Sequence, residues 1–146
     1  MNATAIGKTV KYAVPACLAA ALGLWFWQTA DRPAAASPLV DVKVPELTPL
    51  AARGKTAFDA NCAPCHGTNA AGSDKGPPLV HVIYNPGHHA DGSFFLAAKR
   101  GVRSHHWRFG DMPPQPQVTD DELAAIVRYV RELQAANGIG EQPHRM

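Results

Sequence analysis

Hydrophobic residues are concentrated first in the N-terminal part of the chain. Residues 12–30 contain no charged side chain, and Lys8 and Lys11 precede them. A helix of this length, at about 1.5 Å per residue, spans roughly 28 Å, close to the hydrocarbon thickness of a bilayer. The lysines favour a cytoplasmic N-terminus, and Trp25 and Trp27 suit the opposite membrane interface. The pattern therefore predicts a single-pass anchor that stays on the mature protein.

An alternative is that residues 1–30 act as an export signal that is cleaved. Residues 34–36 (AAA) offer an A-x-A cleavage site, and the product would then be soluble and begin near Ser37. Both alternatives place the rest of the chain on the outer, periplasmic side of a bacterial-type inner membrane. Residues 31–47 are rich in proline and alanine and predict a semi-extended linker.

Helical patterns begin directly after this linker. Thr48 is a favourable N-cap residue, and Pro49 follows at the first helical position. We expect a helix over residues 50–61. The side chains that we expect on its inner side are those of Leu50, Gly54, Ala57 and Phe58.

The clearest helical pattern lies near the C-terminus. Thr119 and Glu122 form a capping box, which predicts a helix over residues 120–136 that ends at Gly138. Apolar residues recur there at helical spacing and predict a buried stripe. The stripe consists of Leu123, Ile126, Val127, Val130 and Leu133.

The segments between these two helices are less regular. Residues 67–90 carry many glycines and prolines and predict a loop, followed by a short helix over residues 93–100 that Gly101 ends. Residues 102–118 predict an irregular stretch with several prolines. No segment has a convincing strand pattern, so the sequence predicts an all-α fold.

Composition adds few constraints to this picture. The chain has 146 residues, including 12 glycines and 13 prolines, which favours one small, loop-rich domain over residues 48–140 with a tail at 141–146. Its 14 basic and 12 acidic side chains give a net charge of +2 and form no basic run, which argues against a nucleic-acid partner. A mildly positive domain suits a protein partner with an acidic surface.

Cysteine spacing points to a particular chemistry. Cys17 lies in the apolar N-terminal run, which leaves Cys62 and Cys65 as a close pair followed by His66. The C-x-x-C-H pattern in residues 62–66 (CAPCH) is typical of covalent haem attachment, because two thiols form thioethers with the two vinyl groups and the histidine reaches the iron. Two alternatives remain: a thioredoxin-like redox pair, and half of a zinc site.

These motifs resemble the class I cytochrome c family, and the likeness covers roughly residues 48–138. Residues 54–58 (GKTAF) resemble the family's N-terminal helix, whose glycine and aromatic pack against an aromatic of the C-terminal helix, here Tyr129. The resemblance implies a small cytochrome c fold around one covalent haem c. It also implies that residues 76–79 (GPPL) supply a carbonyl, that of Pro77, for the proximal His66.

Met112 is expected to be the distal iron ligand. Residues 111–114 (DMPP) resemble the family's distal loop, and Met112 is the only methionine away from the chain ends. Histidine and methionine together fill both axial positions of the iron, which favours electron transfer over catalysis. We therefore expect no enzymatic activity, no catalytic residue and no small-molecule substrate.

Two function classes fit such a domain. The first is a carrier of single electrons in a respiratory chain, between a quinol-oxidising complex and a terminal oxidase. The second is a fixed haem subunit of a membrane-bound dehydrogenase or oxidase. In both classes, residues 12–30 would hold the protein at the membrane.

Histidines near the distal loop are an unusual addition to the family's pattern. Two adjacent pairs flank the short central helix: His88 with His89, and His105 with His106. They are expected to be solvated loop residues, but they are also rival iron ligands or donors for a second metal such as copper or zinc. Trp107 is expected either to bond a haem propionate or to pack at the edge of the core.

Overall fold

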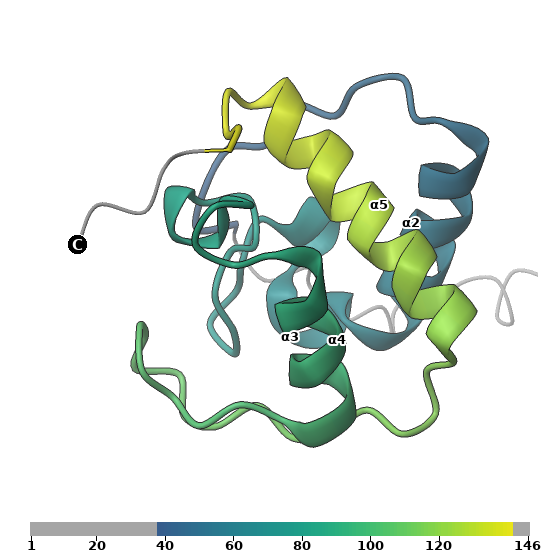
Figure 1. The fold of residues 1–146 in the computed structure, drawn as a ribbon. Coiled ribbons are helices and arrows are strands. Elements are labelled where there is room, and N and C mark those ends of the chain that lie inside the picture. Colours follow the sequence, from purple (N-terminus) through teal and green to yellow (C-terminus); the bar gives the residue numbers. More distant parts are fainter. Residues whose placement is uncertain (1–37, 142–146) are drawn as a thin grey trace, which may run out of the picture. The chain divides into compact units, whose positions relative to one another are not determined.

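The computed structural model describes residues 38–141, and the segment expected to form the anchor lies outside this range. None of the helices within 38–141 is both long and apolar enough to cross a membrane. The described part is helical and contains no strand, as expected of an all-α domain (Figure 1). Its helices are α2 (Pro49–Asn61), α3 (Ala63–His66), α4 (Asp91–Arg100) and α5 (Asp120–Ala136), with 3-10 turns η1 (Thr68–Ala70) and η2 (Val82–Tyr84).

Helix α2 begins as its sequence predicts. The Thr48 side chain accepts a hydrogen bond from the Ala51 amide, and Pro49 occupies the first turn, where no amide proton is needed. The prediction that Leu50 lies on the buried side of this helix was wrong. Leu50 is 39% exposed, and its neighbour Ala51 is fully buried instead. Ala51, Gly54 and Phe58 follow the spacing of 3 and 4 residues that one helix face requires, and Leu50 falls beside that face.

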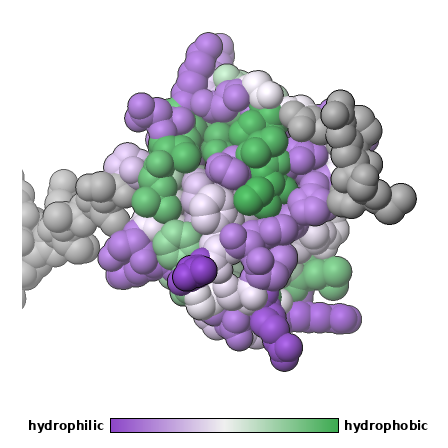
Figure 2. Space-filling view, turned by 90° about the vertical axis from the view of Figure 1, so that its left-hand side faces the viewer, coloured by the Kyte–Doolittle hydropathy of each residue, from purple (hydrophilic) through white to green (hydrophobic). Residues whose placement is uncertain are grey.

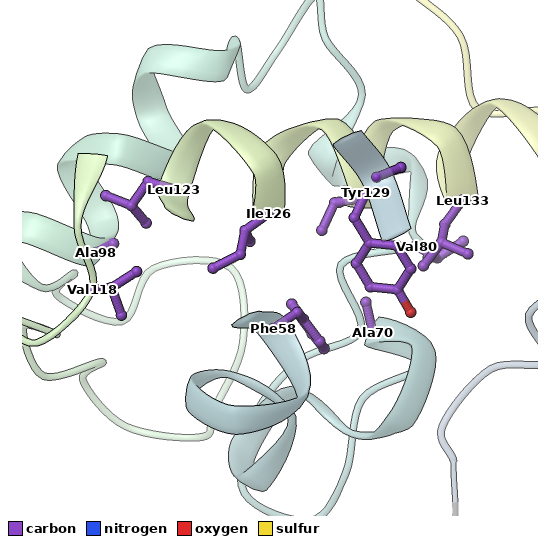
Figure 3. Close-up of a cluster of buried hydrophobic side chains, with 11 residues drawn as sticks. Phe58, Ala70, Val80, Ala98, Val118, Leu123, Ile126, Tyr129 and Leu133 are labelled. Carbon is purple, nitrogen blue, oxygen red and sulfur yellow. The ribbon is translucent and has the colours of Figure 1, made fainter. Parts of the chain in front are cut away.

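Helix α5 packs across α2 (Figure 1). Most residues of the buried hydrophobic core belong to these two helices. Its capping box is present: Thr119 accepts from the Glu122 amide, and the Glu122 carboxylate accepts from the Thr119 amide. The expected stripe is buried throughout. Phe58 and Tyr129 meet edge to face, with ring centroids 5.5 Å apart, as the family resemblance implies (Figure 3).

Helix α4 starts at Asp91, two residues before the expected start at 93. Asp91 suits the first turn of a helix, and its carboxylate also pairs with Arg131 of α5 at 2.8 Å. Gly101 ends the helix with φ +75°, as expected.

The chain after Gly101 extends away from α4 and returns toward it (Figure 1). An antiparallel bridge closes this excursion, in which Val102 and Met112 exchange two backbone hydrogen bonds of 2.9 Å each. Residues 103–111 therefore form a loop whose two ends are fixed.

Candidate functional site

A cavity of about 480 Å³ lies among α3, α4 and the loop that ends at Met112. Most of its walls are apolar, with Phe58, Leu79, Phe94 and Ile126 among them. Cys62, His66, Pro77 and Met112 line the same cavity, so the structure brings together four of the five residues expected at the site. Cys65 is exposed and is not part of the cavity wall.

The C-x-x-C-H segment forms a single helical turn directly after α2. The Cys62 amide donates to the Phe58 carbonyl at 2.8 Å, and the His66 amide donates to the Cys62 carbonyl at 2.8 Å. The next loop packs closely against this turn: Ser73 donates its hydroxyl to the Cys65 carbonyl, and a Cβ on Gly76 would lie 2.9 Å from that oxygen. The backbone of residues 62–66 is therefore held in place from both sides.

The protonation of Cys62 argues against a thioredoxin-like pair. Burial, and to a lesser degree the nearby Cys65 charge, raises the pKa of the Cys62 thiol to about 11. A redox-active pair needs a lowered pKa and a stable thiolate. A zinc site needs further donor side chains beside the two cysteines. Within residues 38–141, the group of side chains close enough together to share a metal ion contains three histidines and neither cysteine.

The His66 ring is held in one orientation, and its surroundings favour the neutral form. Its Nδ1 lies 2.9 Å from the Pro77 carbonyl oxygen, the contact that the family resemblance implies. An Nδ1–H that donates to this oxygen leaves Nε2 unprotonated and orients the ring. Burial lowers the pKa of His66, and the hydrogen bond to Pro77 opposes this effect only in part. The imidazole therefore stays in the form that binds metals.

Met112 owes its position to Gly101 and to the bridge with Val102. A Cβ on Gly101 would lie 2.5 Å from the Met112 carbonyl oxygen, and the φ of +75° also favours glycine there. The two backbone segments can therefore approach closely, which places the half-buried Met112 in the cavity wall.

Trp107 is a further residue of the cavity wall. Its Nε1 is buried and is the one such side-chain atom among residues 38–141 without a hydrogen-bond partner. Burial raises the pKa of the Tyr84 phenol, and the neighbouring Trp107 indole lowers it by a smaller amount. The two groups do not reach the geometry of a hydrogen bond. An unpaired buried N–H is unfavourable, and a haem propionate is a suitable acceptor. Apolar walls, paired thiols, an imidazole and a thioether together fit a haem c.

Two residues that support the cavity were not expected from the sequence. Gln134 is fully buried and donates to the carbonyls of Leu79 and Tyr84, at 2.9 and 3.0 Å. Arg131 donates to the Tyr84 and His89 carbonyls. Both side chains hold the segment that forms one wall of the cavity. In the sequence, the only sign of this role is that the two residues lie three positions apart beside the apolar stripe.

The fold and this site are those of a class I c-type cytochrome with one haem. The family model named Cytochrome c matches residues 51–134, and the chain belongs to that family. The cofactor is therefore a covalently bound haem c, whose iron supplies reversible one-electron chemistry.

A curated relative extends the comparison. The chain is 37% identical over 105 residues to a protein of Bradyrhizobium diazoefficiens named Cbb3-type cytochrome c oxidase subunit FixP. The aligned part covers 67% of this chain and 36% of that protein, so the chain spans about a third of its relative's length. No solved structure matches the chain significantly.

Proposed function

We propose that this chain carries single electrons on a haem attached through Cys62 and Cys65, with His66 and Met112 as axial ligands. The observation that carries the proposal is that His66 and Met112 line one apolar cavity together with Cys62. Two protein ligands leave no iron position open to a substrate, so the domain transfers electrons and is not itself an enzyme. Cys65, on the exposed side of α3, marks the haem edge through which electrons would pass.

Three histidines compete with Met112 for the distal position, because His89, His105 and His106 also line the cavity. Met112 is favoured by its backbone, which the bridge to Val102 fixes at the cavity wall. The Nδ1 atoms of His89 and His105 lie beside the carbonyls of Ile83 and Arg103, so each of these rings can offer only its Nε2 to an iron.

The distal ligand can be tested with Met112→Ala in the ferric holoprotein. We expect wild type to show the weak methionine-to-iron charge-transfer band, and the variant to lose it. Its reduction potential should also fall, by a sizeable part of the roughly 0.8 V that axial ligands span in haem proteins. His106→Ala is the matched control and should keep the band. A wild type without the band would contradict methionine ligation and favour one of the histidines. A band that survives Met112→Ala would show that Met112 is not its source.

The electron-transfer partners are proposed from the relative. Its name assigns it to a cbb3-type oxidase, which favours a respiratory chain that ends in a terminal oxidase. In the first form of the proposal the chain is a separate carrier between a quinol-oxidising complex and the oxidase. In the second form it is a fixed haem subunit of an oxidase or dehydrogenase.

Purification from native membranes in mild detergent distinguishes the two forms. A carrier elutes alone as a monohaem protein, whereas a subunit elutes with further haem or metal centres of its enzyme. Adding the oxidase substrate should change the haem absorption in both cases. A haem that no respiratory substrate reduces or oxidises would contradict the proposal as a whole.

We also propose that the domain lies at the outer face of the bacterial inner membrane, anchored by residues 12–30. The support is the sequence alone: an uncharged run, lysines before it and tryptophans at its far end. The intact mass of the natively expressed protein tests this. A soluble product that begins near Ser37 would show that the segment is a cleaved signal.

A further inference from the structure

Four histidines from two separate loops come together beside the cavity. His88 and His89 precede α4, and His105 and His106 lie in the loop between Val102 and Met112. The ring of His89 lies 5.2 Å from that of His106, and the ring of His88 lies 5.5 Å from it, measured between centroids. The His105 and His106 rings are 4.3 Å apart. Residues that are 16 to 18 positions apart in the sequence thus form one imidazole cluster.

Three of these histidines can reach a single ion. His88, His89 and His106 each offer one ring nitrogen, and these atoms all lie within 4.8 Å of one another. Tetrahedral zinc with Zn–N bonds of about 2.0–2.1 Å requires N···N separations of roughly 3.3 Å. His88 and His106 are exposed, so small rotations of their side chains can close this difference.

The backbone around the cluster is already ordered. The buried Asn85 side chain accepts hydrogen bonds from the amides of Gly87 and His88, at 3.0 and 3.2 Å. The His89 amide donates to the Asn85 carbonyl at 2.8 Å, and Arg131 holds the His89 carbonyl. A metal would therefore meet a turn whose conformation needs no rearrangement.

The ring of His89 is oriented as in known metal sites. Its Nδ1 lies 2.8 Å from the Ile83 carbonyl, so a proton on Nδ1 is donated there and Nε2 keeps its lone pair. His105 has the same arrangement with the Arg103 carbonyl, also at 2.8 Å. Backbone carbonyls commonly fix metal-binding histidines in this way.

Electrostatics favour the neutral form of His89 and His106. Burial lowers the pKa of both His89 and His106, and the neighbouring imidazoles lower it further. The Arg131 guanidinium adds to this effect at His89. Neutral imidazoles are the form that binds a transition metal.

We propose that His88, His89 and His106 form a binding site for a divalent transition-metal ion of the zinc and copper class. All three donors are imidazoles, which suit Zn²⁺ and Cu²⁺ and not Mg²⁺ or Ca²⁺. His89 and His106 also line the haem cavity, so the ion would lie at the rim of that cavity. Three protein ligands leave a fourth position for water or for an external donor.

The test uses full-length holoprotein and Zn²⁺ as the probe. Isothermal titration should show one zinc bound per wild-type chain, and His88→Ala/His106→Ala should weaken binding at least about tenfold. His81→Gln is the matched control, because His81 is a histidine outside the group of three, and it should bind as wild type does. X-ray absorption at the zinc edge should show three imidazole ligands in wild type.

Several results would overturn the site. One is equal zinc affinity in wild type and the double variant; another is an equal loss in His81→Gln. The ferric haem spectrum provides a third check: it should be the same in the double variant and in wild type. A changed spectrum would mean that these histidines serve the haem iron, and the proposal would then be wrong.

Discussion

Gln134 is a polar residue that the core has enclosed completely. Its amide nitrogen donates to the carbonyls of Leu79 and Tyr84, and its oxygen accepts from Arg131 at 2.6 Å. Arg131 also lies over the Phe94 ring, 4.9 Å from its centroid. Through these contacts two side chains of α5 donate hydrogen bonds to backbone carbonyls on both sides of η2.

Replacing Gln134 with leucine should destabilise the protein by about 1–3 kcal/mol, because the Leu79 carbonyl would be buried without a donor. Gln117→Leu is the matched control: Gln117 is exposed, and its loss should change stability by no more than about 0.5 kcal/mol. Denaturant unfolding of the ferric holoproteins measures both. Equal effects of the two substitutions would show that the buried network does not stabilise this loop.

The contacts of a single residue could be predicted from the sequence only where a short motif carries the information. The contact of His66 with Pro77 follows from two short motifs that the family resemblance interprets, and the structure contains it. Leu50 was misplaced because a helix face shifts by about 100° per residue, so one position decides between core and solvent. Gln134 was missed because its hydrogen-bond partners are 50 and 55 residues away.

The contact between α2 and α5 depends on Gly54. A Cβ at this position would lie 1.9 Å from the Ala125 carbonyl oxygen, so the two helix backbones touch there. Phe58 and Tyr129 lie one turn further along the same contact (Figure 3). The closeness of these helices sets the position of the C-x-x-C-H turn, because that turn follows α2 without a break.

Gly54→Ala should therefore destabilise the fold by about 1–3 kcal/mol, since the helices must separate to admit the methyl group. Gly92→Ala is the matched control, because Gly92 is also helical and a Cβ there meets no atom within 4 Å. That change should be neutral or stabilising by up to about 1 kcal/mol. Thermal unfolding followed by circular dichroism measures both. A stable Gly54→Ala protein would contradict the close helix contact.

The elements themselves were largely predictable. Capping signals at Thr48 and Thr119 located the starts of α2 and α5, because N-caps bond amides only two or three residues away. The start of α4 was less well predicted: Ala90 makes no side-chain cap, so the sequence carries no clear start signal there. The bridge between Val102 and Met112 is a contact between irregular segments, for which no periodic pattern exists.

Over the whole described domain, the cavity is assembled from segments that are far apart in the chain. The C-x-x-C-H turn, the segment around Pro77, α4 and the loop that ends at Met112 all contribute to its wall. Motifs identified the chemical groups, whereas the gathering of the four histidines required the folded arrangement of two loops. Large apolar side chains remain exposed, and Figure 2 shows apolar residues between hydrophilic ones on one face. Across the described residues, the large apolar side chains that remain exposed are Leu39, Val44, Leu50, Val82 and Leu96.

The central claim is that one haem is bonded covalently to Cys62 and Cys65. The most direct measurement is the mass of the denatured holoprotein after acid–acetone extraction, followed by the mass of its proteolytic peptides. We predict one haem per chain that survives extraction and is found on the peptide that contains both cysteines. A protein whose haem is removed by extraction, or a haem bonded to any other peptide, would contradict the account.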